Sequence, residues 1–425
     1  MNKRQVVVLW IIAIVLALAA FISRSGNSND FESKTDRERG QTVLADFPAK
    51  NVAKIQINSG DDQATLVRKD GSWTVENRDQ YPANITAVNE FLRTLSEVEV
   101  TQGIEAEPSV APRFGLDPDS SDETDRGIDV VMSDDAGKQL AHVTFGKNLE
   151  SGDNRMSMMS GGATGRFIQN HEDESGFYVV SEIFPTLTAQ PKGWLKDDFL
   201  KVEKIKSISV SPRGMPTKID WMVSRDDDTA ELTLADPKDG ETLDSGSATA
   251  LKGLFAYTRF EDILPDDMYD DYASLLEMRT VKIDTFEGFH YTFKICPIVR
   301  DKQEPTPEGQ DPQPDFLMTV DVAAEIPAER KKEADETEDD AKTKDEAFAK
   351  RKGELEQRLA ADKKFAGIVF KVGAYTVQSF MKDRADILQK PAAAGQSANG
   401  MPGAMPNRPR RPVQAVTPPI AIPGR

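Results

Sequence analysis

The sequence contains very little cysteine and histidine, which limits the kinds of site it can form. Of its 425 residues, one is cysteine (Cys296) and three are histidine (His142, His171 and His290). A single cysteine excludes a disulfide framework and a cysteine-based zinc cluster. Three histidines leave little material for a histidine-rich metal site. We therefore predict no metal ion and no cofactor.

Motifs for phosphate, acyl and metalloprotease chemistry are also missing. The sequence has no Gly-x-x-x-x-Gly-Lys-Ser/Thr loop, no Gly-x-Ser-x-Gly elbow and no His-Glu-x-x-His helix. The formal net charge of −18 repels phosphate backbones, so the body is not expected to bind nucleic acid. We predict a protein that is not an enzyme, without catalytic residues or an identified small-molecule substrate.

Three further features are only weak indications of a binding or catalytic function. An acidic cluster could ligate Ca²⁺, but its spacing is not that of an EF-hand, so we predict a solvated loop. His142 and His290 alternate onto the more polar face of their strands, whereas His171 sits in a polar loop with no partner histidine. The tryptophans are expected in cores or at sheet edges. The acidic cluster comprises Asp117, Asp119, Asp122, Glu123 and Asp125.

What the sequence does contain is one long apolar run near its start. Residues 6–22 include no charge, proline or glycine, and Lys3, Arg4 and Arg24 flank them. Such a run predicts a helix that spans a bilayer, with the flanking cations at the interfaces. We predict a transmembrane signal anchor at residues 1–24 with the body outside the cytoplasm. A cleaved signal peptide is the alternative, because Ala17-Leu18-Ala19 resembles a cleavage site.

The body shows one series of patterns twice. Residues 25–45 are polar and predict a flexible stalk. After them, short alternating strands, a turn and an amphipathic helix face recur in the same order in residues 46–198 and residues 199–390. Alternation with one polar face predicts antiparallel sheets that helices cover on the other side. The predicted fold class is α+β, with two repeated modules.

Two segments fall outside this repeat. Residues 325–364 carry thirteen acidic and eleven basic residues and predict a charged helical insertion in the second module. A thin apolar seam (Ala341, Phe348, Leu355 and Leu359) leaves two alternatives open, a solvated helix or a helix that docks a partner. Residues 391–425 are rich in proline, contain four arginines and no acid, and predict a disordered cationic tail.

Several short motifs together resemble a known family. They are Lys69-Asp70-Gly71-Ser72-Trp73, Phe114-Gly115-Leu116-Asp117, Phe145-Gly146-Lys147 and the ending Arg384-Ala385-Asp386-Ile387-Leu388. This combination resembles the bacterial membrane-anchored family called domain of unknown function 4340. The resemblance implies an accessory role beside ABC-type transport systems of the gliding-motility kind, and it brings no catalytic residues.

These observations predict a single-pass protein of the bacterial inner membrane with a periplasmic body. Its expected role is a non-catalytic scaffold or accessory subunit of an ABC-type transport or gliding-like complex. Strand edges, the charged helix and the cationic tail are the expected contact surfaces. The alternative is a module that binds envelope polysaccharide or peptide through Trp73 or the strand edges. A hydrolase or metal-dependent enzyme is the third reading.

Overall fold

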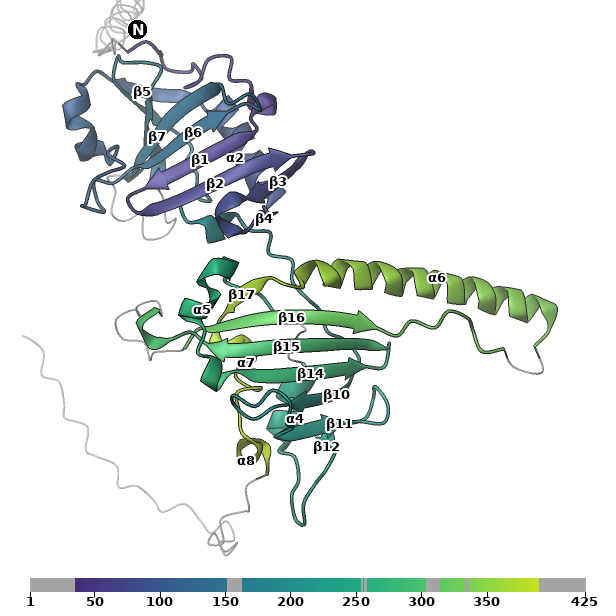
Figure 1. The fold of residues 1–425 in the computed structure, drawn as a ribbon. Helices are drawn as coiled ribbons and strands as arrows, with labels where there is room; N and C mark the ends of the chain where they lie inside the picture. The colour runs from purple at the N-terminus through teal and green to yellow at the C-terminus, as the bar shows by residue number, and fades with distance from the viewer. Residues whose placement is uncertain are drawn as a thin grey trace, which may run out of the picture.

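The computed structural model describes residues 35–150, 163–253, 255, 258–302, 314–332 and 336–389. They form two antiparallel sheets with helices against them, which confirms the α+β class (Figure 1). The predicted anchor and the predicted cationic tail lie outside the described residues. Within the described residues, no helix is long and apolar enough to cross a membrane.

The first sheet has nine strands, and its inner face is made by alternating apolar residues. In β1, for example, Ile55 and Ile57 are fully buried while Lys54 and Gln56 are partly exposed. The strands in spatial order are β4 (Tyr81–Pro82), β3 (Ser72–Val75), β2 (Asp62–Lys69), β1 (Lys54–Ser59), β6 (Ile128–Ser133), β7 (Gln139–Glu150), β8 (Ala163–Asn170), β9 (Phe177–Val180) and β5 (Val100–Ile104).

The second sheet has eight strands and a similar alternation. Along β15, Phe289, Tyr291, Phe293 and Ile295 are buried between more exposed neighbours. The strands in spatial order are β12 (Thr233–Leu234), β11 (Trp221–Ser224), β10 (Ile205–Val210), β14 (Arg279–Thr285), β15 (Phe289–Pro297), β16 (Phe316–Ala324), β17 (Val369–Val372) and β13 (Asp262–Leu264).

The two sheets have the same topology once β4 is set aside. In the first sheet, β1 to β3 form a meander, β6 to β9 continue from β1, and β5 pairs with β9. In the second sheet, β10 to β12 form the meander, β14 to β17 continue from β10, and β13 pairs with β17. The register agrees as well: Ile55 lies between Leu66 and Met132, and Ile208 lies between Val223 and Ile283. This match confirms the predicted repeat of two sheet modules.

The first module has a helix at the place that the apolar periodicity predicts. Helix α2 (Ile85–Glu97) begins after Asn84, whose side chain accepts a hydrogen bond from the Ala87 amide at 3.2 Å. Its buried face comprises Val88, Phe91, Leu92 and Leu95. The other helices are α4 (Ser245–Lys252), α5 (Tyr269–Tyr272), α6 (Glu338–Asp362), α7 (Ala374–Val377) and α8 (Arg384–Ile387).

The described end of the predicted stalk is part of the first module, so a flexible stalk was wrong for residues 35–45. Val43 and Leu44 are buried in the core, and the Val43 amide donates to the Val98 carbonyl at 3.1 Å. The Gly40 amide donates to the Val100 carbonyl at 2.8 Å. This segment covers the free edge of β5, because two adjacent apolar side chains anchor it there.

The two modules share a continuous apolar core. Tyr81, from the first sheet, contacts the rings of Phe260 and Phe370 edge-on, with centroid distances of 5.7 and 6.4 Å. Arg78 of the first module forms a two-pronged ion pair with Asp262 of the second, at 2.7 and 2.9 Å. Both apolar and ionic contacts therefore fix one module against the other.

Candidate functional site

Helix α6 is the most prominent surface feature of the described residues. It runs along the second sheet and projects beyond the end of that sheet (Figure 1). Thr337 caps its start, accepting a hydrogen bond from the Asp340 amide at 3.3 Å, and three acidic residues follow in the first turn. Within the helix only Leu355 and Asp362 are buried. We call residues 325–332 and 336–362, which lead out to the helix and form it, the α6 arm.

The predicted apolar seam of the helix is divided between two environments. Leu355 is buried, and Leu359 packs against the main core, so the C-terminal half is docked on the second sheet. Ala341 and Phe348 lie further out, where most neighbouring residues are exposed. The outer half is held to the leading segment by Arg330, which pairs with Asp345 at 2.9 Å and with Glu336 at 2.5 Å.

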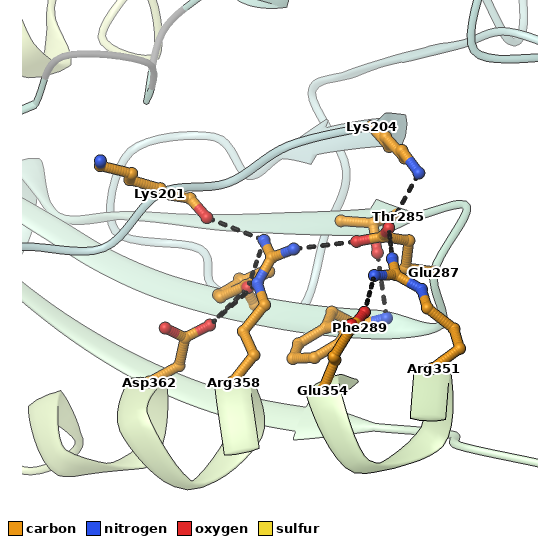
Figure 2. Close-up of polar contacts among 10 residues, drawn as sticks. Lys201, Lys204, Thr285, Glu287, Phe289, Arg351, Glu354, Arg358 and Asp362 are labelled. Carbon is orange, nitrogen blue, oxygen red and sulfur yellow. Dashed lines mark hydrogen bonds and ion pairs between the residues drawn. The ribbon is translucent and has the colours of Figure 1, made fainter. Parts of the chain in front are cut away.

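The docked half of α6 is fixed by a cluster of charges around Glu287 (Figure 2). Glu287 lies in the turn between β14 and β15, and its side chain is only 9% exposed. It binds Lys204 at 2.9 Å, Arg358 at 2.8 Å and also Arg351. The Arg358 guanidinium also lies 4.8 Å from the ring centroid of Phe289. One carboxylate thus joins the sheet to two turns of the helix.

The titration behaviour of this cluster follows from its burial and charge. Burial opposes ionisation of Glu287, but Lys204, Arg351 and Arg358 outweigh it and hold the pKa of Glu287 below its usual range. Burial raises the pKa of Asp362, although Tyr291 donates a hydrogen bond to it at 2.8 Å. The cluster is an ionic anchor for the helix, and its groups are engaged with one another.

A cavity of about 660 Å³ lies at the junction of the two modules. Its walls include Tyr81 from the first module, Phe199 from the linker, and Arg259 and Phe365 from the second module. Charged residues of both signs line it as well, among them Lys196 and Asp197. The rings are already engaged in edge-on contacts within the core, so the cavity lies above the packed joint between the modules.

The structure brings together two histidines that the sequence analysis treated separately. His142 in β7 and His171, directly after β8, stack with ring centroids 3.8 Å apart and planes at 13°. The prediction that His171 has no partner histidine was wrong, because the pairing of β7 with β8 places these residues opposite each other. Only the strand register, which the sequence does not display, could have revealed this.

Asp129 of β6 completes the cluster. His142 Nε2 lies 2.8 Å from Asp129 Oδ1, and His171 Nε2 lies 3.8 Å from the same oxygen. Thr144 donates a hydrogen bond to Asp129 Oδ1 at 2.8 Å and lies 2.8 Å from His171 Nε2. Burial and the neighbouring His142 lower the pKa of His171. The three side chains converge on one point of the outer sheet face.

The other candidate residues from the sequence are buried or form hydrogen bonds and ion pairs within the protein. In the acidic cluster, Asp122 accepts hydrogen bonds from the amide and hydroxyl of Thr124 at 2.9 and 2.8 Å, and Asp125 pairs with Lys147. Cys296 is buried, whereas His290 is bound to Asp284 at 2.7 Å. Trp73 is 4% exposed, so its indole faces the core and offers no platform for a glycan.

The sheet edges are short or covered in the described part of the chain. Residues 40–43 pair with Val98 and Val100 at the start of β5, and the Lys196 amide donates to the Pro82 carbonyl of β4 at 2.9 Å. Arg78 binds Asp262 at the start of β13, and β12 is two residues long. An added strand from a partner therefore has little free backbone to pair with.

Two motifs that carry the family resemblance meet in the fold. Gly115 has φ +66° and ends a short helical turn, a conformation that favours glycine. A Cβ at Gly146 would lie 2.3 Å from the Phe114 carbonyl oxygen, so the chains approach too closely there for any side chain. Lys147 then donates to the Arg113 carbonyl at 3.1 Å. The motifs thus form a packing contact.

The chain is also similar to a known protein family. No curated protein and no solved structure matches the chain. A family model does match residues 73–279, from Trp73 in β3 to the first residue of β14. The matched region includes both glycine motifs, the joint between the modules and the start of the second repeat. Over these residues the chain matches the family described as "Domain of unknown function (DUF4340)".

Proposed function

We propose that this protein is a non-catalytic scaffold, held at the outer face of the bacterial inner membrane by its N-terminal anchor. In this proposal the body is an accessory subunit of a membrane complex of the ABC-transport type, as the family resemblance implies. The α6 arm is the contact surface, and recognition through it is the function.

The observation that carries this proposal is the division of α6 into a docked half and an exposed half. A helix of 25 residues extends over about 37 Å, far more than its docking on the sheet requires. The outer half contributes no buried residue, yet Arg330 holds it in a fixed position beside the leading segment. A rigid exposed helix carrying charges of both signs suits a polar docking partner.

The test is a cross-linking and co-purification experiment from membranes. A photoreactive residue in place of Lys342, in the exposed outer half, is expected to cross-link to a membrane protein. The matched control places it at Asp70, on a turn of the first sheet far from the arm in sequence. Co-purification of transporter subunits with the full chain, lost when residues 338–350 are replaced by a Gly/Ser linker, supports the proposal. If no membrane protein is recovered with the intact chain, the scaffold proposal fails.

Binding of envelope polysaccharide or peptide is the weaker alternative. Trp73 lies in the core, and the edges of both sheets are short or covered. The two surfaces expected for such binding are therefore poorly accessible to a ligand. A saturable pull-down with cell-wall material that does not depend on the α6 arm would favour this alternative over the scaffold.

A further inference from the structure

The cluster of Asp129, His142 and His171 has no place in the scaffold proposal. Two of the three histidines in the chain lie here, one in β7 and one directly after β8, although 28 other residues separate them in the sequence. Both Nε2 atoms approach the same carboxylate oxygen. We propose that these three side chains form a binding site for a divalent transition-metal ion, with Zn²⁺ as the best match.

The chemistry of the ligand set favours such an ion. Two imidazole nitrogens and one carboxylate oxygen suit Zn²⁺ and its neighbours, whereas Ca²⁺ and Mg²⁺ prefer oxygen ligands alone. Three protein ligands leave one position of a tetrahedral zinc ion open to solvent. His171 and His142 have side chains 32% and 27% exposed, so an ion can reach them from the solvent.

The distances also fit with small movements. Ligand atoms about 2.0–2.1 Å from a tetrahedral zinc ion lie roughly 3.3 Å from one another. In the structure the two histidine nitrogens lie 2.8 and 3.8 Å from Asp129 Oδ1, and the three ligand atoms all lie within 4.8 Å of one another. The two imidazole rings must also rotate out of their stacked arrangement so that both Nε2 atoms point at one ion.

The second module shows that the fold does not need this cluster. The equivalent pairs Met132–Ala141 and Ile283–Tyr291 align the two registers. When the two sheets are aligned on these pairs, the positions of the cluster hold other residue types in the second module. Asp129, His142, Thr144 and His171 correspond to Thr280, Thr292, Lys294 and Asp321. The same sheet therefore forms with two threonines, a lysine and an aspartate at this place.

The surrounding charge favours a cation. A polar cavity of about 390 Å³ opens beside Asp129, and Asp61, Asp62 and Asp119 also line it. Asp129 is the member of the cluster that lines this cavity, and carboxylates close to a site raise the local concentration of cations. Thr144, which donates to Asp129 and contacts His171, is placed to orient the ligands.

The competing explanation is a hydrogen-bond network without any metal. His171 can donate to Thr144, Thr144 donates to Asp129, and His142 donates to the same carboxylate. A network of this kind affects the stability of the protein equally with and without metal. A metal site instead makes stability and spectroscopy depend on the ion, so the two explanations give different results.

The experiment uses the purified full-length chain in detergent, with an affinity tag that contains no histidine, after treatment with a chelator. Zn²⁺ binding is measured by calorimetry, and Co²⁺ is added separately to record its d–d absorption. The variants are His142→Gln and His171→Gln, whose amides keep a donor within reach of the same oxygens. The matched control is His290→Gln, because His290 pairs with Asp284 but has no second histidine nearby.

We expect one Zn²⁺ ion per chain, a rise in melting temperature with Zn²⁺ but not with Ca²⁺, and a tetrahedral Co²⁺ spectrum. Each glutamine variant should lose the Co²⁺ spectrum, and Thr144→Val should weaken Zn²⁺ binding by about tenfold. His290→Gln should bind as the natural chain does. The proposal is overturned if Zn²⁺ binding is not saturable, or if the double variant H142Q/H171Q, shown to be folded by circular dichroism, binds Zn²⁺ as tightly as the natural chain.

Discussion

Arg78 and Asp262 are 184 positions apart in the sequence and form a two-pronged ion pair across the joint between the modules. Both side chains are mostly buried, at 20% and 16% exposure. The Asp262 carboxylate also accepts a hydrogen bond from the Ile263 amide at 2.8 Å, which fixes its orientation. The pair therefore sets the relative position of the two modules as well as stabilising them.

Replacing Arg78 with alanine should lower the free energy of unfolding by about 1–3 kcal/mol, because a mostly buried carboxylate loses its partner. Arg78→Lys should recover only part of this loss, since an ammonium group cannot bind both carboxylate oxygens in one plane. Urea unfolding followed by tryptophan fluorescence measures both. Additive effects of Arg78→Ala and Asp262→Ala in a double-mutant cycle would contradict the direct coupling.

The ionic anchor of α6 depends on Glu287. Glu287→Gln keeps the size of the side chain but removes the charge that Lys204 and Arg358 share. We expect a loss of about 1–3 kcal/mol and faster hydrogen exchange across the helix, with the first sheet unaffected. Mass spectrometry of exchanged peptides resolves the two regions. The control is Glu356→Gln, which alters an exposed charge on the same helix. Unchanged protection of residues 351–362 in Glu287→Gln would contradict the role of Glu287 as the anchor of the helix.

The same cluster predicts how docking of α6 depends on pH. Glu287 has a pKa below its usual value of 4.5, so the stability it contributes is complete above pH 4.5 and is lost as the pH falls through its lowered pKa. Asp362 acts in the opposite direction: burial raises its pKa, so its contribution to stability decreases as the pH rises and the buried carboxyl must ionise. The protection of α6, measured relative to the slower intrinsic exchange at low pH, should therefore fall below pH 4.5. In Glu287→Gln this acid-dependent step should be absent.

Cys296 should be unreactive in the folded protein. Burial raises its pKa to about 11, and Tyr269 contributes a hydrogen bond that only partly opposes this. At pH 8 almost no thiolate is present, and the side chain is 1% exposed. Ellman's reagent should label one thiol per chain in 8 M urea and none within minutes under native conditions. Rapid native labelling would place Cys296 at the surface.

Much of the fold was predictable from local pattern. Alternation marked strands such as β15, and the spacing of Val88, Phe91, Leu92 and Leu95 marked α2, because these patterns describe a buried face directly. The repeat was visible for the same reason. The packing of residues 35–45 was not, since Val43 and Leu44 form no period in a polar segment.

The candidate sites were predictable only in part. The charge and helical character of residues 325–364 could be predicted, although the helix itself covers only Glu338–Asp362. Its anchor on Glu287 joins side chains 64 and 71 positions apart. The prediction that Trp73 lies in a core or at a sheet edge was confirmed. Because its side chain is buried, it is not accessible for stacking against a ligand.

By itself the sequence determined the α+β class, the duplication and the family, because each of these rests on residues that are neighbours along the chain. Only the tertiary structure decided that Arg78 meets Asp262 and that His142 lies against His171. Such contacts depend on the register and order of strands, which many weak interactions over a whole sheet fix together and no short stretch of sequence records.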